Sequence, residues 1–124
     1  MLIDGELTEK IIGAAMKVHS ALGPGLLESA YEACLAFDLA RQGLGVQKQV
    51  AVPLKYDGVT LDCGFKIDLL VERRVVVELK AVDRFEPVHE AQLITYLKLS
   101  GHRTGLLMNL KVAALRDGII RRVV

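Results

Sequence analysis

Two acidic residues and a lysine in the middle of the chain have the spacing of a catalytic group. The segment Glu72-Arg73-Arg74 is predicted to turn the chain between two strands, and a hairpin symmetric about Arg73 places Asp68 opposite Glu78. Directly opposed side chains in such a pair have Cβ atoms about 4.5–5.5 Å apart. Two carboxylates about 5 Å apart repel by roughly 3 kcal/mol at an effective dielectric constant near 20. We therefore expect a positive charge between them.

A divalent cation would balance this pair better than Lys80 alone. Lys80 lies two residues beyond Glu78 on the same face of its strand, roughly 6.5–7 Å away. Mg²⁺ prefers oxygen ligands and is often held by one or two carboxylates. The pattern predicts Mg²⁺, or Mn²⁺ in its place, at Asp68 and Glu78, with Lys80 orienting or deprotonating the attacking water. The alternative is an ordinary surface ion pair between Glu78 and Lys80, with Asp68 solvated.

Four further polar residues are candidates to complete the site. Gln92 and Tyr96 are four residues apart on a predicted helix and share one face, where an amide and a phenol can hold a water or a phosphate. Glu28 begins another predicted helix, with Tyr31 one turn further on, and is a candidate third carboxylate for the metal. The structural alternatives are a core position for Tyr96, a solvent-facing Gln92, and an N3 position from which Glu28 bonds back to the helix N-cap.

The elements that must position these residues follow from the hydrophobic pattern. Helical periodicity predicts two helices, over residues 8–22 with Thr8 as N-cap and over about 26–42. His19 lies on the apolar stripe of the first helix, which favours a hydrogen-bonded structural histidine. The alternative for His19 is a supporting bond to Glu28 or to a carbonyl of the glycine-rich stretch at 23–25.

Beyond Gly45 the period changes to two, which predicts strands. Apolar residues of 46–56 are expected to share one face, and Asp57-Gly58 predicts a hairpin turn into a strand over 59–71. From 66 to 80 one parity, which includes Ile67 and Leu69, is aliphatic, while the other carries the charges. A buried strand at 75–80, a helix at 87–101 and strands at 105–110 and 119–124 complete an α/β chain of the α+β sandwich type.

Composition limits the classes of function. The length of 124 residues predicts one domain over residues 1–124. The formal net charge of +1 excludes a histone-like coat for nucleic acid. No apolar run approaches the roughly 20 residues of a membrane span, and the first residues lack a signal-peptide pattern, so we expect a cytoplasmic protein without a membrane partner. The chain has no Trp and 5% aromatic residues, which argues against a broad platform for stacking bases.

The stretch from Gly25 to Tyr31 reads as GxxExxY, and the chain resembles the GxxExxY protein family. That family in turn resembles the PD-(D/E)XK nuclease superfamily. The similarity extends over nearly the whole chain and implies a restriction-endonuclease-like core: a central mixed β-sheet flanked by helices, with an extra N-terminal helix. The resemblance matches the metal and catalytic positions of the D…ExK motif to Asp68, Glu78 and Lys80, the helical acid before the core to Glu28, and the QxxxY of recombination-type exonucleases to Gln92 and Tyr96.

Three functions follow from these residues. The first is Mg²⁺-dependent hydrolysis of phosphodiester bonds in nucleic acid, with DNA as the expected polymer on the strength of the resemblance. The second is a non-cleaving module that keeps the nuclease fold and binds nucleic acid or a protein. The third is hydrolysis of a small phosphoester or nucleotide. Because a chain of this length leaves little surface beyond its core, substrate selection is expected to involve a homo-oligomer or a partner subunit.

Overall fold

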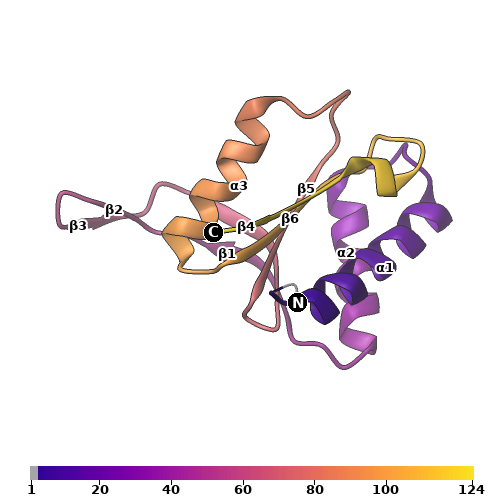
Figure 1. Cartoon of the computed structure of the whole chain (residues 1–124), viewed down its shortest axis with the longest axis horizontal. Coiled ribbons are helices and arrows are strands. Elements are labelled where there is room, and N and C mark those ends of the chain that lie inside the picture. Colours follow the sequence, from indigo (N-terminus) through magenta and orange to yellow (C-terminus); the bar gives the residue numbers. More distant parts are fainter. Residues whose placement is uncertain (1–2) are drawn as a thin grey trace.

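The computed structural model describes residues 3–124, in which helices lie on both sides of a mixed sheet (Figure 1). The order of helices and strands agrees closely with the pattern of periods in the sequence. In chain order the elements are α1 (Gly5–Leu22), α2 (Glu28–Arg41), β1 (Val46–Ala51), β2 (Leu54–Tyr56), β3 (Val59–Leu61), β4 (Lys66–Val71), β5 (Val75–Lys80), α3 (Pro87–Ser100), β6 (Thr104–Asn109), the 3₁₀ turn η1 (Leu115–Gly118) and β7 (Ile119–Val123).

The central sheet has the strand order β1-β4-β5-β6-β7. Only β5 and β6 run parallel, and α3 is the crossover that connects them. The helices α1 and α2 cover one face and α3 covers the other, while β2 and β3 form a separate hairpin that extends away from the sheet (Figure 1). This arrangement confirms the predicted α+β fold with a mixed sheet flanked by helices.

Each face of the sheet has its own apolar core. The first cluster joins α1 and α2 to one face and includes Ile11, Leu35 and Leu69, and the second joins α3 to the other. The second face of the sheet, which was predicted to carry the charged residues, is therefore also largely covered by apolar side chains. Ile67, predicted beside Leu69, instead belongs to the α3 cluster. Pairing on both sides of β4 is interrupted at Asp68, so the two-residue alternation does not continue through that residue.

The predicted single strand over 46–56 is wrong. Gln49 has a φ of 52°, in the left-handed region, and this changes which side of the sheet the following residues face. Val46 packs toward α1 and α2, whereas Val50 and Val52 pack toward α3. The predicted strand over 59–71 is likewise two strands, β3 and β4. The Asp57-Gly58 hairpin itself is confirmed, with both turn residues at positive φ and Tyr56 paired with Val59.

Most helix ends lie within two or three residues of the predicted positions. Gly23, at a φ of 76°, ends α1, and α3 begins at Pro87 and ends before Gly101. The prediction that Thr8 caps α1 is wrong, because the helix begins at Gly5 and the Thr8 hydroxyl donates to the Gly5 carbonyl at 3.1 Å. No helix within residues 3–124 is both long enough and apolar enough to cross a membrane.

Candidate active site

Asp68 and Glu78 face each other across β4 and β5. The pairing runs in register from Val71 and Val75 to Leu69 and Val77, which makes Asp68 and Glu78 the next pair, as predicted. Regular backbone pairing stops there. The Leu79 N–H donates to Asp68 Oδ2 at 2.8 Å, and the Asp68 N–H donates to Glu78 Oε1 at 3.3 Å. Side-chain carboxylates thus accept the N–H groups where the two strands separate.

Gln49 interrupts the pairing on the other side of β4. The register passes from Lys48 with Leu69 to Val50 with Ile67 and omits Gln49 and Asp68. The Gln49 Nε2 donates to Asp68 Oδ1 at 3.3 Å and to Glu32 Oε1 at 2.7 Å. Three neighbouring strands therefore carry one polar residue each at the same level of the sheet. We call Gln49, Asp68 and Glu78 the polar row.

The Glu78 carboxyl group is almost completely buried, with 4% of the residue exposed. Burial raises its pKa from 4.5 to about 8, and the charge of Asp68 contributes next. Lys80 opposes this rise and is the smallest of the influences on the pKa of Glu78. Within residues 3–124 Glu78 and Lys80 form no ion pair, so the surface ion pair considered as an alternative is not present. Without further positive charge, Glu78 holds its proton at neutral pH.

The donor chemistry of the polar row fits a divalent cation. Two hard carboxylate groups meet at one point, and one of them is buried without a counter-charge. Among the described residues, no group of three or more acidic, histidine or cysteine side chains gathers closely enough to hold a metal ion. The structure therefore brings together the predicted pair of acids, but not a triad with Glu28. Two protein carboxylates suffice for Mg²⁺, which usually keeps several waters.

Glu28 nevertheless lies beside the pair. It is exposed and is the first residue of α2, and no side chain caps this helix end, so the alternative of an N3 capping position is wrong. Glu28 and Asp68 line the same cavity of about 270 Å³, together with Ser29, Glu32, Gln49 and Leu79. Glu32 was missed by the sequence analysis. Its signal is the spacing of four residues from Glu28, which places both acids on one face of a helix.

Tyr96 and Gln92 differ in their relation to the acids. Burial raises the pKa of the Tyr96 phenol, and the charges of Glu78 and Asp68 raise it further, so the phenol lies within electrostatic reach of both. Its ring contacts that of Phe65, with 5.9 Å between ring centroids. Gln92 is exposed on α3, and no hydrogen bond within the described residues connects it to the acid pair. Tyr96 thus lies within reach of the charges of the acid pair, whereas Gln92 makes no hydrogen bond to it among the described residues.

Tyr31 and His19 hold the loop that leads into α2. The buried Tyr31 hydroxyl donates to the Gly23 carbonyl and accepts from the Leu26 N–H at 3.3 Å. The buried His19 ring stacks on Tyr31 at 6.2 Å, and its Nε2 donates to the Leu110 carbonyl at 3.0 Å rather than to Glu28 or the glycine-rich stretch. Tyr31 thus fixes the loop before α2, and His19 packs behind it with a hydrogen bond to the chain beyond β6.

Asn109 is a second residue that the sequence analysis missed. It is buried at the end of β6, opposite Lys80 in the register. Its side-chain amide donates to the Val82 carbonyl at 2.8 Å and accepts from the Val82 N–H at 3.2 Å. This clamp fixes the chain just beyond Lys80. Its sequence signal is weak, because it is one polar residue at the end of an apolar run.

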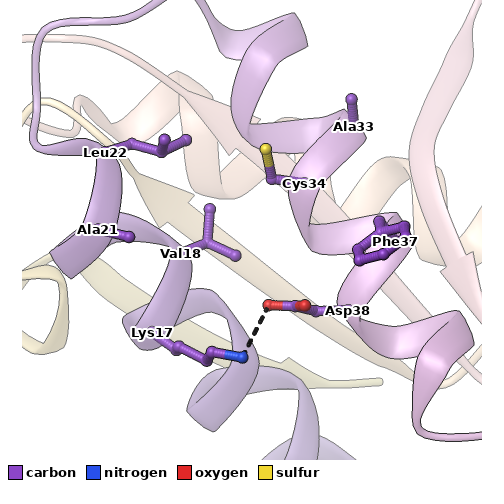
Figure 2. A pocket seen from close by; sticks show the side chains of 8 residues that line it. All are labelled: Lys17, Val18, Ala21, Leu22, Ala33, Cys34, Phe37 and Asp38. Carbon is purple, nitrogen blue, oxygen red and sulfur yellow. Dashed lines mark ion pairs between the residues drawn. The ribbon is translucent and has the colours of Figure 1, made fainter.

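A larger cavity, of about 360 Å³, lies apart from the polar row, between α1 and α2 (Figure 2). Apart from the ion pair between Lys17 and Asp38 at 3.7 Å, most of its lining is apolar. Val18 and Leu22 extend toward it from α1, and Phe37 borders it on α2 (Figure 2). With a single carboxylate that is already paired, this cavity offers no comparable site for a cation.

Comparison with known families is consistent with this geometry. A family model described as the PD-(D/E)XK nuclease superfamily matches residues 5–123, which spans every element from α1 to β7. No match was found among curated proteins or among solved structures. The narrower resemblance to GxxExxY proteins stays a prediction. The mixed sheet with flanking helices agrees with a restriction-endonuclease-like core, and the chain belongs to the PD-(D/E)XK nuclease superfamily.

Proposed function

We propose that this protein is a Mg²⁺-dependent nuclease that hydrolyses phosphodiester bonds, with DNA as its polymer. The observation that carries the proposal is the buried Glu78 carboxyl group facing Asp68 where β4 and β5 separate. A fold maintained by two apolar cores has no evident need for two acids at this point, and a bound cation would remove their repulsion. Membership of a nuclease superfamily supports this chemistry.

Each residue of the site has a distinct task in this proposal. Asp68 and Glu78 hold the cation, and Mn²⁺ is an expected substitute. When bound, Mg²⁺ supplies Lewis-acid stabilisation of the charge that develops on the phosphoryl group. Gln49 and the Leu79 N–H fix the Asp68 carboxylate before the substrate arrives. Lys80, half-buried at the end of β5, orients the attacking water or stabilises the transition-state charge.

Substitution of the two acids tests the proposal. We expect Asp68→Asn and Glu78→Gln each to lower Mg²⁺-dependent cleavage of a labelled DNA oligonucleotide by about 10²–10³-fold, because each removes a ligand whose charge is needed. The matched controls are Asp83→Asn and Glu9→Gln, which remove exposed acids with the same change of charge. These controls should cleave like the wild type. Equal cleavage by the wild type and both site variants would overturn the proposal.

The same assay separates the other functions. Cleavage of free nucleotides or small phosphoesters, with oligonucleotides left intact, would indicate the small-substrate hydrolase. Binding of DNA that needs no metal, survives both acid substitutions and leads to no cleavage would indicate the non-cleaving module. Parallel assays with RNA and DNA of the same sequence determine which polymer is used, since the 2′-hydroxyl is the feature that distinguishes them.

A further inference from the structure

Two aromatic side chains meet at the surface next to the polar row. Phe65 ends the loop before β4 and is 36% exposed, so part of its ring is open to solvent. Its ring and the partly buried ring of Tyr96 on α3 have centroids 5.9 Å apart and are tilted by 43°. We call these two residues the aromatic pair.

Two hydrogen bonds hold the loop that presents Phe65. The Val52 N–H donates to the Phe65 carbonyl at 2.8 Å, and the Gly64 N–H donates to the Asp62 carboxylate at 3.1 Å. Gly64 has a φ of 76°, a conformation that suits glycine. These bonds fix the backbone at Phe65, and the contact with Tyr96 orients its ring.

One member of the aromatic pair is close to the acids along the chain, and the other lies within reach of their charges. Phe65 precedes Asp68 by three residues, or about 10 Å at the rise of a strand. The exposed Lys66 lies between them in sequence. Tyr96, the other member, lies within electrostatic reach of both Asp68 and Glu78. The start of β4 thus presents an aromatic ring, a cation and a metal-binding carboxylate in succession.

We propose that Phe65 and Tyr96 bind one nucleobase of the substrate strand by stacking and thereby select unpaired over duplex nucleic acid. The inference rests on the proposed nuclease function and names the substrate class of that same site. A phosphate held at the acids would bring the bases of neighbouring nucleotides toward the aromatic pair. Every base has a π-face that can stack on an aromatic ring. In a duplex that face is already covered, so the site takes a strand whose base is free.

A position-specific assay tests stacking directly. Short single-stranded oligonucleotides with one abasic site, placed at each position of the strand in turn, are bound to the protein without metal and followed by fluorescence anisotropy. We expect one abasic position to weaken binding by the wild type roughly tenfold, since stacking contributes about 1–3 kcal/mol per base. Phe65→Leu should bind the intact and abasic strands equally, and Phe65→Trp should keep the discrimination.

The matched control is Phe37→Leu, the same substitution at an exposed phenylalanine on α2. It should retain the wild-type abasic profile, and thermal unfolding of each variant checks that the fold survives. A wild-type profile that is flat at every position, or a Phe65→Leu variant that still discriminates, overturns the proposal. Because this binding assay contains no metal, its result is independent of cleavage. If Asp68→Asn loses cleavage but the wild-type abasic profile is flat, the stacking proposal fails and the nuclease proposal stands. If the wild type discriminates abasic strands but cleaves nothing, the nuclease proposal fails and base stacking stands.

Discussion

At the scale of single residues, the central feature is Glu78, whose carboxyl group is buried where its ionised form is unfavourable. An ionised side chain buried away from water is costly unless it is paired. The pKa of Glu78, raised to about 8 by burial and by Asp68, expresses that cost. The metal-free protein avoids the charge by holding a proton, and a bound cation would make the proton unnecessary. In the proposed site, the same two side chains would therefore link protonation to metal binding.

This linkage predicts how pH changes the stability of the metal-free protein. Because the folded-state pKa of Glu78 lies above the ordinary value of 4.5, the folded state binds the proton more tightly than the unfolded state. The free energy of unfolding should therefore fall as the pH rises from 4.5 to about 8. Glu78→Gln should remove much of this slope and be more stable than the wild type at the upper end. Urea unfolding in EDTA across this range measures it, and parallel profiles for the two proteins would contradict it.

At the scale of elements, the site depends on strands that stop pairing. The β4 strand loses regular pairing with both neighbours at Asp68, and Gln49 on β1 adopts a left-handed conformation at that level. Non-glycine residues in such conformations cost on the order of 1–3 kcal/mol and persist where the surroundings hold them. Here the hydrogen bonds from Gln49 to Asp68 and Glu32 hold it.

Substitution of Gln49 separates its backbone role from its side-chain role. Gln49→Gly should preserve or raise stability, because glycine adopts a φ of 52° without strain. The same variant should lower kcat for cleavage by about tenfold or more, since Asp68 loses the donor that orients it. Gln49→Val should instead lose on the order of 1–3 kcal/mol of stability, because a β-branched residue is strained there. Urea unfolding and steady-state kinetics check both, and an unchanged kcat in Gln49→Gly would show that the amide does not position Asp68.

At the scale of the whole molecule, two apolar cores make one polar level of the sheet tolerable. Strands β4 and β5 are covered on one side by α1 and α2 and on the other by α3. Gly105 allows this close packing on the α3 side, because a Cβ atom at that position would lie 2.7 Å from Leu93. The polar row therefore lies on strands of a well-packed sheet rather than on a loop, with Glu78 buried and Gln49 exposed on the edge strand.

A cation bound by the folded chain alone should stabilise the whole molecule. Mg²⁺ at 100 times its dissociation constant would add about 2.7 kcal/mol to the free energy of unfolding. We expect Mg²⁺ and Mn²⁺ to raise the Tm of the wild type, and Glu78→Gln and Asp68→Asn to respond much less. Glu9→Gln serves as the control, since it removes an exposed acid on α1. Equal shifts in Tm for the wild type and both site variants would place any bound cation elsewhere.

Local chemistry in the sequence was enough to predict the hairpin that brings Asp68 to Glu78. The turn at Glu72-Arg73-Arg74 and the period of two set that register between neighbouring segments, and both are properties of short stretches. For the same reason the sequence correctly predicted that α1 ends at Gly23 and that α3 begins at Pro87. These features need no knowledge of how distant segments pack.

Tertiary structure alone decided the rest of the site. Three contacts join segments that are distant in the sequence: Gln49 with Glu32, Phe65 with Tyr96, and Asn109 with Val82. The left-handed conformation of Gln49 and the burial of Glu78 likewise depend on neighbours from several elements. Periodicity reports which face of an element is apolar, but not which side chain of another element will meet it. The physical reason is that burial and its electrostatic consequences arise only when the helices close over both faces of the sheet.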